Sequence, residues 1–223
     1  MTSTSEAPDI RQVSARRRRL IVLAIGGVLV GLLAGWLTIQ FVTGNWRLGP
    51  YKYRGVVLPA PESVSDFSLT AHDGETARLS DFRGQIAVLY FGYTYCPDVC
   101  PTTLATLANA LDDLKAADRD QVQVLMVTVD PDRDSPGVLA DYLAHFDPTF
   151  IGLTGTAGEL AQAAEALGIY YEKGEGSVAS GYLVDHTATV SVLDKEGRLR
   201  LLFPFGTPAE DIAADLQHLI RES

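Results

Sequence analysis

The feature that most constrains this chain is an apolar stretch, residues 20–42, that contains no charged side chain. As an α-helix rising about 1.5 Å per residue, this stretch would be roughly 34 Å long, enough to cross a hydrocarbon core of about 30 Å. It is longer than the apolar segment of a cleavable secretory signal, which has about 7–15 residues. We therefore predict an uncleaved transmembrane anchor over residues 20–42.

The charges beside this stretch predict its orientation. Four consecutive arginines, Arg16–Arg19, end the N-terminal tail, and basic residues of this kind remain on the cytoplasmic side of a membrane. Trp36 and Trp46 would lie toward the opposite interface, where tryptophan is enriched. We expect residues 1–19 to be cytoplasmic and the rest of the chain exported. A tail this short favours a bacterial inner membrane and a periplasmic domain over a mitochondrial location.

The exported part divides into a tether and one domain. Residues 43–61, with Pro59 and Pro61, are expected to be the tether, and residues 62–223 the domain. The whole chain has a formal net charge of −10 although its N-terminal tail is basic, so the exported domain is strongly acidic. Such a domain repels nucleic acid and anionic lipid and is attracted to basic partner surfaces.

Alternating apolar runs and helical patterns predict the core of the domain. A continuous apolar run over residues 86–91 is typical of a strand buried on both faces, and residues 122–129 form a second such run. Helical spacing of leucines follows the first run, with Pro101 suited to the first turn. A hairpin over residues 189–203 and a helix after Thr207 complete the pattern. This βαβ unit followed by ββα predicts a thioredoxin-like α/β fold.

Two additions to that core are expected. Asp73-Gly74 lies between two short apolar segments, which is a turn signal for an N-terminal β-hairpin. Ser135-Pro136 begins a helix inserted after the second buried strand, and Thr156 with Glu159 forms a capping box for another helix. The predicted fold is therefore thioredoxin-like, with an added N-terminal β-hairpin and an inserted helix, preceded by one transmembrane helix.

The chain has two cysteines, Cys96 and Cys100, in a loop between the first buried strand and the following helix. Their spacing suits a disulfide, a redox pair, a nucleophile with its resolving partner, or two thiolates bound to one soft metal ion. The helix N-terminus supplies partial positive charge and free N–H groups, so we expect both thiolates to form more easily than in a free peptide. Geometry alone leaves these alternatives open.

A histidine is expected to join the two thiols. The predicted strand that begins at Thr189 runs antiparallel to residues 86–91, so its start lies beside the end of that strand and the cysteine loop. His186 comes just before this start. Thioredoxin-like oxidoreductases carry a cis-proline near this position, but the chain has no proline between Pro148 and Pro204. We therefore predict that His186 is a ligand alongside the two thiols.

Two thiolates and one imidazole form a soft set of three ligands. A structural zinc site takes four protein ligands, and the sequence offers no evident fourth cysteine or histidine. Thiolates select Cu(I), and imidazole also suits copper. Copper is therefore the metal expected at Cys96, Cys100 and His186, as Cu(I), with Cu(II) as the second oxidation state to test.

Three segments resemble the SCO/SenC family: residues 91–101 (FGYTYCPDVCP), residues 130–134 (DPDRD) and residues 182–187 (YLVDHT). They agree with the family in order and spacing, and the resemblance covers the anchor and essentially the whole exported domain. It implies a membrane-anchored copper chaperone that helps to build the CuA centre of cytochrome c oxidase subunit II and receives copper from an upstream donor protein. By motif position, the family's copper ligands correspond to Cys96, Cys100 and His186.

Several carboxylates accompany these ligands. Asp98 within the cysteine loop and Asp185 beside His186 are candidates to orient a ligand or to handle its proton, and loop solvation or a turn explains each equally well. Asp130 follows the second buried strand and faces the same edge of the sheet. Together with Asp132 and Asp134, it fits a turn and helix cap better than a hard-metal site or an acidic docking patch.

Two enzymatic alternatives remain beside the metallochaperone. The first is a thiol–disulfide oxidoreductase that uses Cys96 and Cys100, including one that reduces the cysteines of the same target before copper delivery. The second is a thiol peroxidase, suggested by Thr94 near Cys96 and by the N-terminal hairpin. The wide cysteine spacing and the missing proline speak against the first, and the position of Thr94 speaks against the second.

Overall fold

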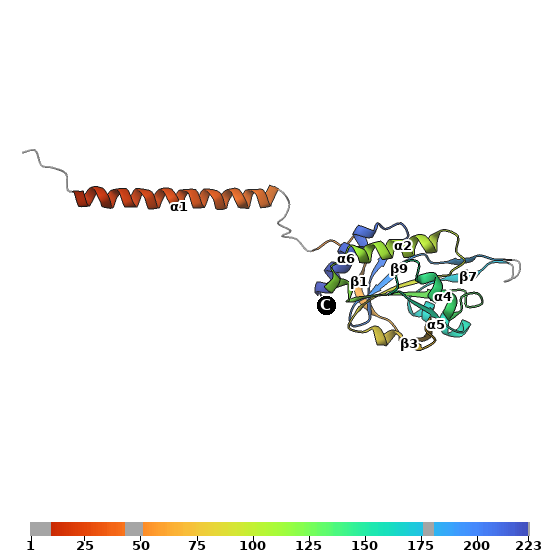
Figure 1. Cartoon of the computed structure of the whole chain (residues 1–223). Coiled ribbons are helices and arrows are strands. Elements are labelled where there is room, and N and C mark those ends of the chain that lie inside the picture. Colours follow the sequence, from red (N-terminus) through yellow and green to blue (C-terminus); the bar gives the residue numbers. More distant parts are fainter. Residues whose placement is uncertain (1–9, 43–50, 176–180, 223) are drawn as a thin grey trace, which may run out of the picture. The chain divides into compact units, whose positions relative to one another are not determined.

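The computed structural model describes residues 10–42, 51–175 and 181–222, and the chain forms two compact units, Met1–Lys52 and Tyr53–Ser223. In the first unit, helix α1 (Ile10–Val42) contains an apolar stretch, Leu20–Ile39, that is long and apolar enough to cross a membrane (Figure 1). The helix begins before the predicted anchor and includes the arginine cluster. Residues 1–9 and 43–50, including Trp46, lie outside the described residues.

The second unit contains a mixed sheet with the strand order β1-β10-β9-β4-β5-β6-β2-β3. Its strands are β1 (Val56–Ser63), β2 (Ser68–Ala71), β3 (Thr76–Arg78), β4 (Ile86–Gly92), β5 (Val122–Thr128), β6 (Ile151–Thr154), β9 (Val190–Leu193) and β10 (Arg198–Phe203). β4, β5 and β6 are parallel, whereas β9 is antiparallel to β4 and places Val190 opposite Tyr90. This arrangement confirms the predicted thioredoxin-like fold. It also confirms that the strand after His186 runs antiparallel to β4, so that His186 lies near the end of β4.

The centre of the sheet follows from the apolar runs in the sequence. All seven residues of β4 are buried, as are all but one of the residues of β5, because helices and loops cover both faces. The hairpin of β2 and β3 turns at Asp73-Gly74 as predicted, and it extends the sheet by pairing β2 with β6. The strand pattern therefore identified both the core and one edge of the domain.

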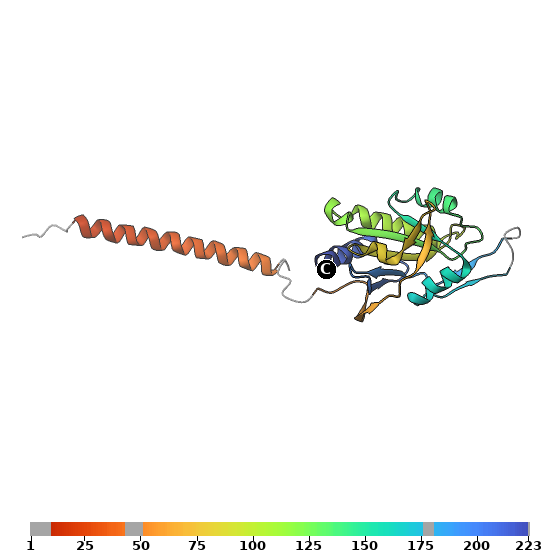
Figure 2. The same cartoon turned by 90° about the horizontal axis from the view of Figure 1, so that it is seen from below.

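The described residues of this unit also form the helices α2 (Val99–Asp112), α3 (Ala116–Arg119), α4 (Pro136–Leu143), α5 (Ala157–Ala166) and α6 (Ala209–Glu222), and the 3₁₀ helix Leu79–Phe82. α2 and α6 lie side by side (Figure 2), and Figure 1 shows α5 on the opposite side of the sheet from α2. α4 packs on β6 at Gly152, where a Cβ atom would lie only 2.8 Å from Leu139. The predicted capping box between Thr156 and Glu159 is present at the start of α5.

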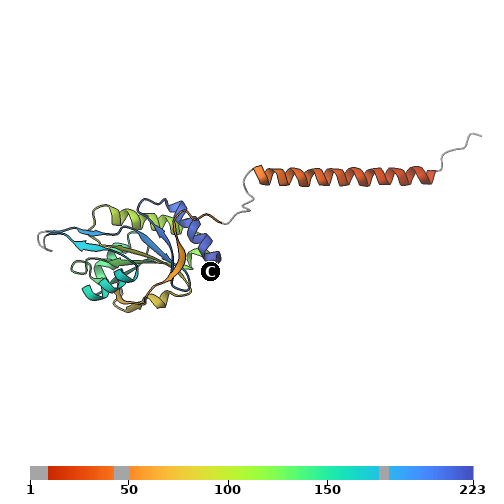
Figure 3. The ribbon, with the colours of Figure 1, turned by 180° about the vertical axis from the view of Figure 1, so that it is seen from behind.

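Strand β1 begins within residues 43–61, the predicted tether, and continues for two residues into the predicted domain. It pairs antiparallel with β10 (Figure 3). Its register shifts between Val57 and Glu62, around the two prolines. The residues directly before β1 are held by Asp215 of α6, a buried carboxylate that accepts hydrogen bonds of 2.8 Å from the N–H groups of Arg54 and Gly55. Proline and an exposed edge weakened the strand signal, whereas the partner that stabilises the segment is distant in sequence.

A second, two-stranded sheet was also not predicted. It consists of β7 (Tyr171–Lys173) and β8 (Val184–His186), paired antiparallel with Tyr171 opposite His186. We call this pair of strands the ribbon. Each strand has only three residues, too few for a periodic signal to distinguish it from a loop. The ribbon carries His186, so it belongs to the structural basis of the predicted site.

Replacing Asp215 with alanine tests whether its carboxylate holds the segment before β1. The variant Asp215→Ala leaves two backbone N–H groups without their acceptor and removes a buried partner of Arg54. We expect the free energy of unfolding of a fragment starting at residue 51 to fall by about 2–4 kcal/mol in urea denaturation. The exposed Asp113 provides the control: Asp113→Ala should change it by less than about 0.5 kcal/mol. Equal effects of the two substitutions would contradict the assignment.

Candidate metal centre

Three donor atoms meet where β4 ends. The thiols of Cys96 and Cys100 and a ring nitrogen of His186 all lie within 4.8 Å of one another, and Cys100 Sγ is 3.5 Å from His186 Nε2. The structure thus brings together the three residues that the sequence analysis selected as ligands. It is the one group of this kind found within residues 10–42, 51–175 and 181–222.

The cysteines are positioned by the junction between β4 and α2. Cys96 lies in the loop and is partly buried, whereas Cys100 lies in the first turn of α2 and is fully buried. The N–H group of Cys100 donates to Cys96 Sγ over 3.3 Å, so the helix N-terminus interacts with the first thiol. At Gly92, a Cβ atom would lie 3.0 Å from Cys100 Sγ and 2.7 Å from the ring of Tyr90. Glycine therefore allows the buried thiol to approach the end of the strand.

Burial dominates the protonation of Cys100. It raises the pKa of the Cys100 thiol to about 12, and the neighbouring Tyr90 side chain opposes this shift only in part. The prediction that the helix N-terminus makes both thiolates easier to form is therefore wrong for Cys100. The reason is that removal of a thiolate from water costs more than the dipole of the helix recovers at this depth. In the metal-free protein at neutral pH, Cys100 is a thiol.

His186 presents its Nε2 atom to the thiols. Its Nδ1 atom lies 3.2 Å from the carbonyl oxygen of Thr187, which suits an Nδ1–H donor and leaves a lone pair on Nε2. Burial lowers the pKa of His186, so the neutral imidazole is the form present at pH 7. The rings of Tyr90 and Tyr93 meet the imidazole edge-on, with centroids 6.1 and 5.9 Å away. The imidazole is therefore a neutral, oriented donor in an aromatic surrounding.

The three candidate accessory carboxylates have different surroundings. Asp98 is exposed at the N-cap of α2 and lies within 3.5 Å of the Thr102 hydroxyl, and Asp185 is exposed on β8 next to His186. Asp130 is buried, accepts a 2.5 Å hydrogen bond from the Tyr182 hydroxyl and forms an ion pair with Arg133. Asp130 is therefore connected to the residues around the ligands, whereas Asp98 and Asp185 lie at the surface beside them.

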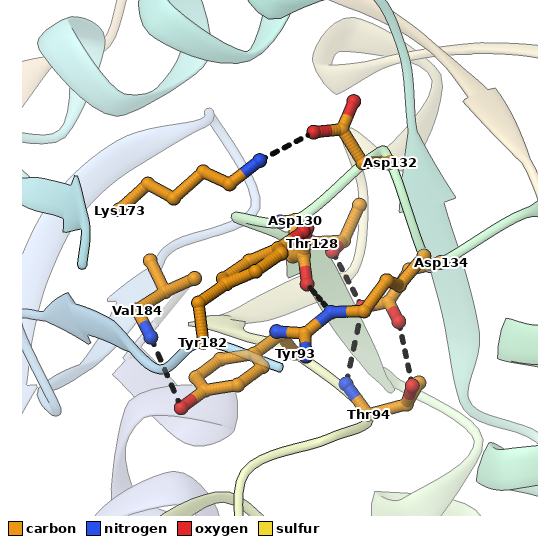
Figure 4. Close-up of polar contacts among 10 residues, drawn as sticks. Tyr93, Thr94, Thr128, Asp130, Asp132, Asp134, Lys173, Tyr182 and Val184 are labelled. Atoms are coloured by element: carbon orange, nitrogen blue, oxygen red, sulfur yellow. Dashed lines mark hydrogen bonds and ion pairs between the residues drawn. The ribbon is translucent and has the colours of Figure 1, made fainter. Parts of the chain in front are cut away.

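Four residues near the ligands were not selected from the sequence: Tyr90, Tyr93, Arg133 and Tyr182. Figure 4 shows Tyr93 and Tyr182 among the aspartates that follow β5, with the Tyr93 hydroxyl accepting from the N–H group of Val184 over 3.2 Å. All four belong to, or directly adjoin, segments that also carry the cysteines, the aspartates or His186. Their position within those motifs was the available signal, but their burial was not visible in the sequence.

Comparison with known proteins places this geometry in a family. A family model described as SCO1/SenC matches residues 58–221. The chain belongs to the SCO1/SenC family. The mouse protein "SCO2 homolog, mitochondrial" is 33% identical over 211 residues, which cover 94% of this chain and 81% of the mouse protein. Family membership thus extends over the sheet, the cysteine loop and the ribbon.

Solved structures of SCO proteins share the fold. Apo Sco1 of Thermus thermophilus is 43% identical, with a TM-score of 0.69, and the match covers 76% of this chain and 98% of that protein. ScoI of Bradyrhizobium japonicum, solved with copper bound, is 34% identical, with a TM-score of 0.65, and the match covers 70% of this chain and 99% of that protein. The similarity thus includes a SCO protein without copper and one with copper.

The protonated state of Cys100 predicts a pH dependence for any metal ion held by this group. The metal must displace the Cys100 proton, because a thiolate is the ligand and the pKa of the thiol is about 12. With Cu(I) as the probe, the apparent affinity should rise with pH from about pH 6 to pH 8, by about tenfold per pH unit for each proton displaced. Competition titration at several pH values measures this slope.

Two variants check the origin of the slope. In Cys100→Ser, tight binding is lost, and the weak Cu(I) binding that remains should show a pH slope smaller by the contribution of one proton. In His186→Ala, the slope between pH 7 and pH 8 should remain, because an imidazole whose pKa is lowered below its ordinary value is already neutral there and has no proton to release. An affinity independent of pH in the unmodified protein would contradict the assignment of Cys100 as a ligand.

Proposed function

We propose that this SCO1/SenC protein is a membrane-anchored copper metallochaperone that binds copper through Cys96, Cys100 and His186. The observation that carries the proposal is the convergence of two thiols and one neutral imidazole within 4.8 Å of one another. Two sulfur donors suit Cu(I), and the imidazole adds a nitrogen donor that Cu(II) also accepts. The target that the family resemblance implies is the CuA centre of cytochrome c oxidase subunit II, and the implied source is an upstream copper donor protein.

The uneven burial of the ligands supports delivery rather than permanent storage. Cys100 is buried, whereas Cys96 and His186 are partly exposed. An incoming ligand from a partner can therefore replace the accessible donors one at a time while Cys100 still holds the ion. Asp98 and Asp185, exposed beside these ligands, are proposed to assist proton transfer or to contact a basic partner surface.

The N-terminal helix supports anchoring in a membrane. α1 contains Leu20–Ile39, which is long enough to span a bilayer, and an arginine cluster comes directly before it. We propose a single-pass protein of a bacterial inner membrane, with residues 1–19 cytoplasmic, residues 20–42 as the anchor, residues 43–61 leading to the domain, and residues 62–223 periplasmic. This topology places the copper site on the periplasmic side.

A thiol–disulfide reductase remains the second candidate, because the two thiols lie close together and differ in exposure. Cys96 is partly exposed, and its sulfur accepts a hydrogen bond from the N–H group of Cys100, which suits an attacking thiol. The buried Cys100 suits a resolving thiol. Such an activity would reduce the cysteines of the target before copper is delivered. It would use the same pair of thiols and would not need His186.

Loss of either cysteine should abolish tight copper binding. We expect the reduced protein to bind one Cu(I) per chain, and Cys96→Ser or Cys100→Ser to lose this binding, because a hydroxyl group is a poor ligand for a soft ion. Metal analysis after anaerobic loading measures the stoichiometry. Oxidation of the pair to a disulfide should also block loading. Cu(I) binding that persists after removal of both cysteines would disprove the proposed site.

Replacement of His186 separates the two candidate functions. His186→Ala should lower Cu(I) affinity modestly and Cu(II) affinity by tenfold or more, since Cu(II) depends more on nitrogen donors and ligand loss commonly costs about this much. Thiol exchange should remain largely intact. Copper competition titrations, together with oxidase activity in a strain that carries only the variant, measure both consequences.

The matched control is His145→Ala, because His145 is an exposed histidine on the segment after α4. It should leave copper affinity and oxidase assembly unchanged. Normal copper affinity and normal oxidase in the His186→Ala strain would show that His186 is a packing residue and not a ligand.

A further inference from the structure

The metal ligands lie on two separately hydrogen-bonded parts of the domain. Cys96 and Cys100 follow β4 of the eight-stranded sheet, whereas His186 ends β8 of the ribbon, which is a sheet of its own. The distance between His186 and the thiols therefore depends on side-chain contacts as well as on the short connection from β8 to β9. Arg133 is at the centre of these contacts.

Arg133 contacts Tyr182, which lies just before strand β8 of the ribbon. Its side chain is only 6% exposed and forms an ion pair with Asp130, whose side chain is 2% exposed. The guanidinium carbon lies 3.8 Å from the ring centroid of Tyr182, just before β8, and the Tyr182 hydroxyl donates to Asp130. Tyr182 is thus held by its ring and by its hydroxyl (Figure 4). Because Tyr182 is four residues before His186, the Asp130–Arg133 ion pair restrains the chain close to His186.

The same guanidinium also lies close to two tyrosines in the segment that leads to Cys96. Its central carbon is 4.6 Å from the ring centroid of Tyr95 and 5.7 Å from that of Tyr93. Tyr95 immediately precedes Cys96. Tyr93 contacts the ring of His186 and accepts a hydrogen bond from Val184 of the ribbon. Arg133 therefore lies among aromatic rings from both segments that carry ligands.

The turn that presents Arg133 is itself fixed to the cysteine loop. Asp134 is buried and accepts hydrogen bonds from the N–H group and the hydroxyl of Thr94, at 3.0 and 2.5 Å, and from the hydroxyl of Thr128, at 2.7 Å. Thr94 lies two residues before Cys96. The turn anchored in this way fixes the position of Arg133 relative to the cysteine loop. The contacts of Arg133 with Tyr182 therefore set the position of Tyr182 relative to the thiols.

We propose that Arg133 is a positioning residue of the metal centre, which sets the place of His186 relative to the two thiolates without contacting the metal. The proposal rests on the proposed function of Cys96, Cys100 and His186 as copper ligands. A planar guanidinium can pair with Asp130 and lie against the Tyr182 ring at the same time, which a lysine ammonium cannot do as well. Arg133→Lys is therefore expected to fall between the unmodified protein and Arg133→Met.

The first measurement needs no copper. In the full chain, reduced and held in detergent micelles, we compare hydrogen–deuterium exchange of the peptide covering residues 181–187. Arg133→Met should raise exchange in this peptide, because Val184 and its neighbours lose the contacts that hold the ribbon. Exchange in β4 and β5 should stay unchanged, which also shows that the variant is folded. Tyr182→Phe, which removes only the hydroxyl bound to Asp130, is the milder second variant and should raise exchange less.

The second measurement uses Cu(II) competition titration. Arg133→Met should lower Cu(II) affinity by about tenfold or more, as is typical when a residue that orients a ligand is removed. In a His186→Ala background, the same substitution should lower it by less than about twofold, because the residue that Arg133 positions is already absent. The matched control is Arg119→Met, which breaks another pair with a buried aspartate, Asp147, and should leave both measurements unchanged.

The outcomes separate this inference from the proposed function. Unchanged exchange in residues 181–187 of a folded Arg133→Met protein would overturn the positioning role. An equal loss of Cu(II) affinity in the presence and absence of His186 would also overturn it. If the unmodified protein bound no copper, the proposed function would fail. Increased exchange in the variant would then support a role for Arg133 in holding the ribbon, but not a role in metal binding.

Discussion

The parallel pairing of β4 with β5 is the constraint on which the rest of the structure depends. Parallel strands require a crossover connection, and here α2 begins where β4 ends and returns the chain to the start of β5. The first turn of α2, with Cys100, must therefore lie at the carboxyl end of the sheet. β9 pairs antiparallel on the other side of β4, so the residues before it arrive at the same edge. Cysteines and histidine meet there because of strand direction, although 86 positions separate Cys100 from His186.

Burial then decides the chemistry at this edge. A fully buried Cys100 keeps its proton until a soft cation compensates the charge of the thiolate, whereas a partly buried His186 remains neutral and ready to bind. Both effects leave Cys100 and His186 uncharged beside aromatic rings, and both favour a cation that binds thiolate and imidazole. Asp130 and Arg133 are buried as charged groups, and this is possible because they form an ion pair and Asp130 also accepts a hydrogen bond from Tyr182. The site thus combines neutral ligands with paired charges at its side.

Much of the fold could be predicted from the sequence because its signals are local. Continuous apolar runs identified β4 and β5, Asp73-Gly74 identified a hairpin, and Thr156 with Glu159 identified a helix start. Each pattern depends on residues within a few positions of one another, where geometry limits the alternatives. The ligands could be proposed for a related reason: the order of strands, once assigned, determines which chain segments share an edge. His186 was found through this topology and not through any property of its own neighbourhood.

The sequence by itself determined the central strands, the helices that connect them, the cysteine loop and the segment that meets it. Only the tertiary structure decided that residues 56–63 pair with β10, that His186 is carried by the ribbon, and that Arg133 is buried between aromatic rings. It also decided the protonation of Cys100, where burial outweighs the helix N-terminus. The physical reason is the same in each case. Edge strands, buried ion pairs and shifted pKa values depend on partners far away in the chain, and no local pattern records how completely those partners exclude water.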